Sequence, residues 1–150
     1  MEVILADYLG FCYGVKRAIT IARENASADG TACTLGPIIH NPQMVERLKG
    51  EGVGTVDRLD DMEKGTVIIR SHGVGPRVYA EAAARGLELV DATCPHVKKA
   101  QLSAKSLVDE GYHVVIIGER EHPEVRSIFE WSNGQAEIIE TEEEAETLVP

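Results

Sequence analysis

The chain has 150 residues, of which 43% are apolar and 27% are charged. This composition is typical of one globular domain and excludes a disordered or collagen-like chain. No apolar run approaches the ~20 residues of a membrane span. The first ten residues include Glu2 and Asp7 but no Lys or Arg, unlike a signal peptide. We therefore expect a cytoplasmic protein with no membrane partner, whose three cysteines stay reduced.

The net charge of -10 is unevenly distributed. Residues 127–150 contain seven Glu and no Lys or Arg, so residues 1–126 hold 18 acids against 15 bases. A nucleic-acid partner is not expected, because binding along a phosphate backbone requires a basic face. A local phosphate site remains compatible with this charge.

Short apolar runs alternate with stretches of helical period, which predicts an α/β fold with a mostly parallel sheet and flanking helices. In chain order, the predicted strands and the helical stretches that follow them are 3–6 and 15–22, 37–39 and 44–48, 66–69 and 78–83, 87–90 and 97–108, and 114–117 and 125–129. Prolines can occupy the first position of a helix, where no backbone N–H is needed, and so mark four helix starts: Pro42, Pro76, Pro95 and Pro123.

A short strand at 136–139 follows the last of these helices. Thr141 and Glu144 have the spacing of a capping box and predict one more helix. Because that helix would end with the sequence, we expect this chain to be part of a longer protein.

Each predicted helix start lies beside a side chain that can bind metal or phosphate. These are Cys12, His40, His72, Cys94 and His122. Ligands of open α/β sheets bind beyond the carboxyl ends of the strands, where helix N-termini favour anions. The five side chains are therefore expected to meet around one pocket.

Cys12 and Cys94 lie in loops rich in Gly, Thr and Pro, at positions where a helix N-terminus favours the thiolate. Two thiolates suit zinc or an iron-sulfur cluster. Cys33, between Ala32 and Thr34 near an apparent strand, is expected to be a packing residue.

The histidines leave two interpretations open. His40, His72 and His122 could donate hydrogen bonds to a diphosphate, or bind zinc as neutral imidazoles. Glu124, in the first turn after Pro123, could either complement the helix dipole or transfer protons as a general acid.

From the residues alone, two alternative functions therefore remain. One is a zinc-dependent hydrolase that uses Cys12, Cys94 and a histidine, with water as the fourth ligand. The other is a non-catalytic module that binds a phosphate ligand while the cysteines only pack.

Five motifs together resemble the family of 4-hydroxy-3-methylbut-2-enyl diphosphate reductase, an iron-sulfur enzyme of the non-mevalonate isoprenoid route. In this sequence they are Gly10-Phe11-Cys12-Tyr13-Gly14-Val15, Ile39-His40-Asn41, Ser71-His72-Gly73-Val74, Asp91-Ala92-Thr93-Cys94-Pro95 and His122-Pro123-Glu124-Val125. The resemblance covers nearly the whole chain, and five motifs in the same order are far more specific than any one of them.

The resemblance implies a 4Fe-4S cluster with Cys12 and Cys94 as two of its three cysteine ligands. It implies that His40, His72 and His122 contact the substrate and its diphosphate, and that Glu124 supplies protons. The implied products are isopentenyl and dimethylallyl diphosphate, with ferredoxin or flavodoxin as the electron donor.

The same resemblance implies three α/β lobes, of which residues 1–93 form the first and residues 94–150 part of the second. The third cysteine ligand would then lie beyond position 150, because Cys33 does not match it. We expect that this chain alone neither holds an intact cluster nor reduces substrate, and that it exposes an apolar seam where the missing lobes dock.

Overall fold

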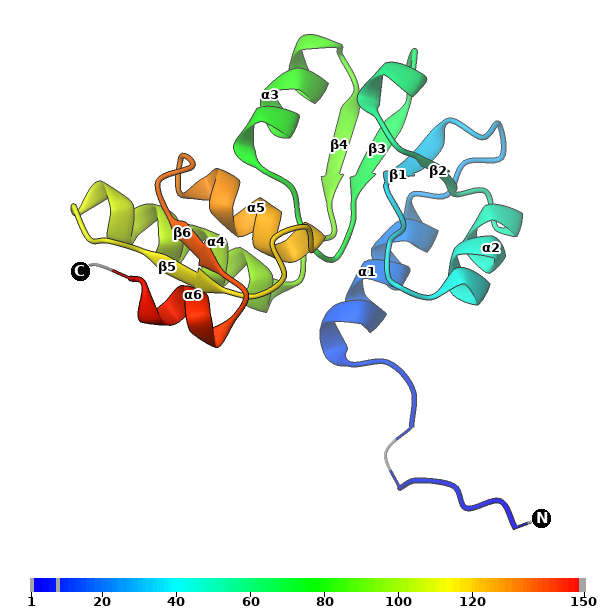
Figure 1. Ribbon diagram of the computed structural model, residues 1–150. Coiled ribbons are helices and arrows are strands. Elements are labelled where there is room, and N and C mark those ends of the chain that lie inside the picture. Colours follow the sequence, from blue (N-terminus) through cyan, green and yellow to red (C-terminus); the bar gives the residue numbers. More distant parts are fainter. Residues whose placement is uncertain (1, 8, 149–150) are drawn as a thin grey trace.

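The computed structural model describes residues 2–7 and 9–148. Its larger sheet has four parallel strands in the order β2-β1-β3-β4 (Figure 1). Their bounds are Ala32–Leu35 for β1, Gly54–Val56 for β2, Thr66–Ile69 for β3 and Glu88–Asp91 for β4. Because all four strands run the same way, the loops that follow β1, β3 and β4 leave from one edge of the sheet.

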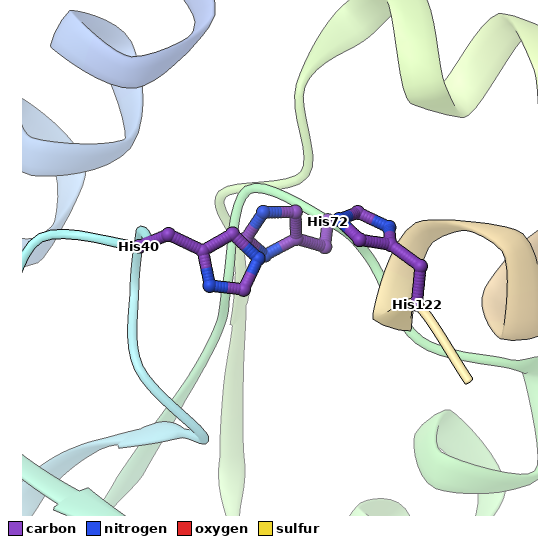
Figure 2. A group of neighbouring side chains, drawn as sticks. All are labelled: His40, His72 and His122. Carbon is purple, nitrogen blue, oxygen red and sulfur yellow. The ribbon is translucent and has the colours of Figure 1, made fainter. Parts of the chain in front are cut away.

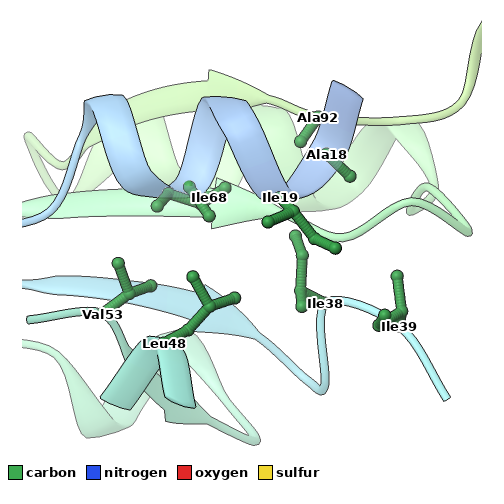
Figure 3. Close-up of a cluster of buried hydrophobic side chains, with 9 residues drawn as sticks. Ala18, Ile19, Ile38, Ile39, Leu48, Val53, Ile68 and Ala92 are labelled. Atoms are coloured by element: carbon green, nitrogen blue, oxygen red, sulfur yellow. The ribbon is translucent and has the colours of Figure 1, made fainter. Parts of the chain in front are cut away.

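Helices cover both faces of this sheet. The helices α1 (Tyr13–Glu24) and α2 (Pro42–Gly50) pack on one face, and α3 (Pro76–Ala84) and the short 3-10 helix η1 (Leu59–Asp61) on the other. Successive residues of β3 alternate between the two cores, as expected for a strand that is buried on both sides. Figure 3 shows the first core, in which Ile68 lies among side chains from both helices and the loops: Ala18, Ile19, Ile38, Ile39, Leu48, Val53 and Ala92.

A second, smaller sheet contains β5 (Val115–Ile117) and β6 (Glu137–Ile139), which are also parallel. The helices α4 (Pro95–Asp109) and α5 (Pro123–Trp131) contribute to its core, and α6 (Glu142–Glu146) follows β6. The α/β class with parallel strands and flanking helices is confirmed. The boundary between a first lobe at 1–93 and a second at 94–150 stays a prediction.

Four helices begin at the residues that the sequence indicates. Their first residues are Pro42, Pro76, Pro95 and Pro123. The C-terminal helix also begins as predicted, because the Thr141 hydroxyl accepts the Glu144 N–H. None of the helices in the described ranges is both long enough and apolar enough to cross a bilayer.

Two predicted strands are wrong. Residues 3–6 form no strand, and Val3, Ile4 and Leu5 are 73%, 83% and 75% exposed. This segment leads away from the larger sheet (Figure 1), and an extended segment without a neighbouring strand gains neither backbone hydrogen bonds nor burial. The strand predicted at 37–39 lies earlier, at β1.

The displacement of that strand has a local cause. Gly36 has a φ of +71°, which turns the chain, and Pro37 lacks the N–H that a central strand donates. Ile38 and Ile39 are nevertheless buried, because the loop they form packs into the first core. The apolar run therefore indicated burial correctly and strand structure incorrectly.

Candidate functional site

Backbone hydrogen bonds connect the loops at the carboxyl edge of the larger sheet. The Ser71 N–H and hydroxyl both donate to the Ile38 carbonyl, at 3.2 and 3.0 Å. The Cys94 N–H donates to the Ser71 carbonyl at 2.9 Å. The loops after β1, β3 and β4 thus continue side by side beyond the strands. This arrangement brings the residues next to Ile38, Ser71 and Cys94 to a common edge.

Three histidines from three different segments lie together at this edge (Figure 2). His40 follows β1, His72 follows β3, and His122 immediately precedes α5. The ring centroids are 4.4 Å apart for His40 and His72, 5.5 Å for His40 and His122, and 5.6 Å for His72 and His122. The sequence placed each histidine after an apolar run. Parallel strands of the larger sheet bring His40 and His72 together, and α5, which contacts the His72 loop through Ser127, adds His122.

The surroundings of His72 and His122 bear on the hydrogen bonds that their rings can make. The Glu124 N–H donates to His122 Nδ1 at 3.2 Å, so the neutral His122 ring carries its proton on Nε2. Burial, together with the neighbouring His40, Arg70 and His122, lowers the pKa of His72 to about 4. At neutral pH His72 therefore adds no charge to the cluster and offers one N–H.

Both candidate cysteine ligands occupy N-cap positions, Cys12 before α1 and Cys94 before α4. Cys12 is exposed and Cys94 is half-buried, and both are free thiols. A Cβ placed on Gly14, in the first turn of α1, would lie 2.5 Å from Cys94 Sγ. The Cys94 sulfur therefore packs against the start of the helix that Cys12 caps.

The loop that carries Cys94 is held by a second group of contacts. Asp91 Oδ1 accepts the Thr93 N–H at 2.9 Å, and Asp91 Oδ2 accepts the Tyr79 hydroxyl at 2.8 Å. Burial opposes ionisation of Asp91, but the hydrogen bonds from Thr93 and Tyr79 and the nearby Lys98 outweigh it and lower its pKa. Arg17 Nη1 donates to the Thr93 carbonyl at 3.1 Å, which connects this loop to α1.

Cys33 lies apart from these loops. It is a half-buried residue of β1 that packs against the second core, which includes Leu35 and Val67. Burial raises the pKa of its thiol, which disfavours the thiolate needed for metal binding. The interpretation of Cys33 as a packing residue agrees with this environment.

The zinc site of the alternative hydrolase, with Cys12, Cys94 and a histidine as ligands, is not formed within residues 2–7 and 9–148. The group there that could hold a metal consists of His40, His72 and His122, whose ligand atoms lie within 4.8 Å of one another. A neutral imidazole whose Nδ1 accepts a hydrogen bond carries its proton on Nε2. Before Nε2 can bind a metal, the proton must move to Nδ1, and the hydrogen bond to Nδ1 is lost. The His122 contact with the Glu124 N–H therefore favours an anion over zinc.

Glu124 lies in the first turn of α5, two residues after His122, and is half-buried. Its carboxylate accepts no hydrogen bond from the part of the chain that the structure describes. The carboxylate is therefore available to a ligand bound beside His122.

A family model described as LytB protein matches residues 3–150. The chain belongs to the LytB protein family. The 4-hydroxy-3-methylbut-2-enyl diphosphate reductase of Geobacter sulfurreducens is 50% identical to this LytB chain over 148 residues, which are 99% of the chain and 52% of the relative. The corresponding protein of Dehalococcoides mccartyi is 50% identical over 134 residues, covering 89% of the chain and 47% of the relative.

Solved structures show the same fold. A structure of (E)-4-hydroxy-3-methyl-but-2-enyl diphosphate reductase, described as the terminal enzyme of the non-mevalonate pathway, has a TM-score of 0.81 and 44% identity, covering 95% of this LytB chain and 52% of that chain. The reductase from Plasmodium falciparum has a TM-score of 0.89 at 28% identity, covering 93% and 45%. The LytB chain spans about half the length of the curated relatives it matches.

Several residues that support the site of this LytB chain had no signal in the sequence. Tyr79 holds Asp91, while Gln101, Ser127 and Trp131 contact the loop after β3 or each other. Each lies inside a helix, where a single polar or aromatic residue fits the amphipathic pattern equally well on the surface. Only the packing of α3, α4 and α5 gives these residues their partners.

Proposed function

We propose that this chain forms part of the active site of a reductase that acts on 4-hydroxy-3-methylbut-2-enyl diphosphate. The reaction breaks the bond between carbon and the hydroxyl oxygen, consumes two electrons and two protons, and releases water together with isopentenyl or dimethylallyl diphosphate. The observation that carries the proposal is the cluster of three histidines from three separate segments. Membership of the LytB family and relatives named as this reductase support it.

The histidine cluster would bind the diphosphate of the substrate. His122 presents an Nε2–H, and His40 and His72 lie within contact of its ring. His40 and His122 also lie at the starts of α2 and α5, where the helix dipole favours negative charge. Holding the diphosphate at this edge fixes the position of the allylic alcohol, and orientation of this kind can lower a barrier by several kcal/mol.

Cys12 and Cys94 fit as two ligands of a 4Fe-4S cluster. Both are free, both cap a helix start, and Gly14 leaves room for the Cys94 sulfur beside α1. Such clusters are held by thiolates, so the further cysteine ligand would come from outside this chain. When bound, the cluster supplies electrons and a Lewis-acidic iron, with ferredoxin or flavodoxin as the proposed electron donor.

Glu124 would deliver protons. Protonation of the departing oxygen makes water rather than hydroxide the leaving group, which lowers the barrier to breaking the bond. Glu124 comes two residues after His122, in the first turn of α5, and so lies beside the proposed diphosphate site. The cytoplasmic location expected from the sequence stays a prediction.

Calorimetric titration of the chain with inorganic pyrophosphate tests the proposal. We expect His72→Ala and His122→Ala each to weaken binding by about tenfold or more, since each removes a hydrogen bond to a charged group. His113→Ala is the matched control, because His113 lies in the loop before β5 and pairs with Glu137. Equal affinities for all four proteins, or no binding by the parent chain, would contradict the proposed function.

A further inference from the structure

The loop after β3, which carries His72, is held by a helix from the other sheet. Ser127 Oγ lies 3.0 Å from the His72 carbonyl oxygen, to which it donates. One turn further along α5, Trp131 Nε1 donates to the Val74 carbonyl at 2.9 Å. Residues four apart lie on the same face of a helix, so this face of α5 holds two backbone carbonyls of one loop.

Gln101 on α4 extends this contact beneath the loop. Its side chain is wholly buried, and its Nε2 donates to Ser127 Oγ at 3.1 Å. Gly73, with a φ of +72°, packs so closely on the Gln101 amide that a Cβ at this position would overlap it. A buried amide costs free energy unless it is hydrogen-bonded. The Gln101 Nε2 has Ser127 as its partner, whereas Oε1 is buried without a partner among the described residues.

Ser127 also contacts the other half of the site. Its hydroxyl lies 2.8 Å from the Glu124 carbonyl oxygen, so the single hydroxyl proton is shared between the carbonyls of His72 and Glu124. His122 precedes the same helix. One side chain therefore links the backbone of the loop that bears His72 to the first turn of the helix that bears His122 and Glu124.

We propose that Ser127 and Gln101 are positioning residues that hold His72 in register with His122 and Glu124 for binding the diphosphate. The inference rests on the proposed function for its ligand, whereas the register itself is a property of the folded chain. Without the hydroxyl, the loop keeps the Trp131 contact at Val74 but loses the contact at His72. The ring of His72 is then free to move away from the 5.6 Å spacing it has with the His122 ring.

The competing explanation is ordinary helix packing. A serine within a helix often returns its hydroxyl to the carbonyl three or four residues earlier, and the Glu124 contact has this form. In that case the loss of the hydroxyl would change only the free energy of unfolding. The two explanations differ in whether the histidine rings move.

The test compares Ser127→Ala with Ser127→Thr, which keeps a hydroxyl, and with Ser106→Ala. Ser106 is an exposed serine of α4 that bonds Glu110 and serves as the matched control. Gln101→Met, which keeps the volume but removes the amide, is a second variant in case Ser127→Ala folds poorly. The readouts are the nuclear Overhauser contact between the His72 and His122 rings at fixed pH, and the affinity for inorganic pyrophosphate.

We expect Ser127→Ala and Gln101→Met to lose the ring contact and to weaken pyrophosphate binding by about fivefold. Ser127→Thr should retain most of both, and Ser106→Ala should match the parent. An intact ring contact in Ser127→Ala and Gln101→Met, with affinity within twofold of the parent, would overturn the inference. If the parent chain binds no pyrophosphate, the proposed function fails, while the ring contact still decides the role of Ser127.

Discussion

Two residues of the candidate site, Gly14 and His72, are explained by the atoms that surround them in the folded chain. Gly14 lies in the middle of the first turn of α1, where any larger residue would meet the Cys94 sulfur. His72 is placed where burial opposes its protonation, and this keeps the centre of the histidine cluster uncharged. At both positions the residue is explained by a neighbour that is distant in the sequence, so the reason for it appears only in the folded chain.

Gly14→Ala should destabilise the protein by about 1–2 kcal/mol, because the new methyl group displaces the Cys94 side chain and overpacks the site. Denaturant unfolding measures the change, and the rate of Cys94 modification by a thiol reagent should rise. Gly50→Ala is the control, since a Cβ at that helical position meets nothing within 4 Å and should stabilise the helix by about 0.5–1 kcal/mol. The same increase in stability from both substitutions would contradict the packing role of Gly14.

The depressed pKa of His72 predicts a stability that depends on pH. Between its ordinary value of 6.5 and about 4, the unfolded chain binds a proton at His72 that the folded chain does not. The free energy of unfolding should therefore fall as the pH falls through this window, by roughly 3 kcal/mol in total. The contribution is fully present above pH 6.5 and completely lost below about pH 4.

Urea unfolding at several pH values, compared with His72→Gln, isolates this contribution. The substituted chain should lose less stability between pH 6.5 and 4 than the parent does. Parallel curves for the parent and His72→Gln would show that His72 titrates normally.

At the scale of elements, the sequence predicts helix starts better than strands. A proline at the first helical position expresses a purely local preference, so Pro42, Pro76, Pro95 and Pro123 mark true starts. A strand requires a neighbour, and the segment at 3–6 has none. The strand β2 was missed for the converse reason, because Gly54–Val56 has weak strand character and gains its place by pairing with β1.

The same contrast applies to the candidate site. The three histidines could be predicted because each follows an apolar run, and parallel strands place the junctions of His40 and His72 at one edge. His122 joins them from the smaller sheet, through the packing of α5. The residues that hold them could not, because Gln101 and Ser127 become neighbours only through the packing of α4 on α5. Local signals therefore identified the groups that face a ligand and missed those that support them.

The cap of α2 provides a prediction for an element that adjoins the site. Asn41 Oδ1 accepts the Met44 N–H at 2.8 Å, so Asn41→Ala should lower the free energy of unfolding by about 1 kcal/mol, and Asn41→Asp should preserve it. Thr141→Ala removes the corresponding cap of α6, which buries no residue, and should have a smaller effect on global unfolding. Thermal or urea unfolding compares them, and a larger loss from Thr141→Ala would contradict this ranking.

The whole molecule exposes apolar side chains in segments on both sides of the site. They include Val3, Ile4, Leu5, Leu9, Tyr13, Leu102, Leu107 and Ile117. Exposed apolar side chains that gather into one large patch are typical of a docking surface. The apolar seam expected for further lobes stays a prediction, and the chain spans about half the length of the relatives it matches.

The number of thiolates sets a limit on what this chain can bind. With Cys12 and Cys94 as its site cysteines, anaerobic reconstitution with iron and sulfide should give less than four iron and four sulfide per chain. Iron and labile sulfide analysis after gel filtration measures the content, and Cys33→Ser should not change it. A full complement of iron and sulfide that survives filtration would show that two cysteines suffice.

The segment that leads from the larger sheet to α4 is short and mostly buried. Only Ala92, Thr93 and Cys94 separate β4 from α4, and Ala92 and Thr93 are buried. A hinge at this point would have to break the contacts of Thr93 with Asp91 and Arg17 and of Cys94 with Ser71. Bending of one sheet against the other would therefore move Cys94 away from its place beside Gly14 at the start of α1.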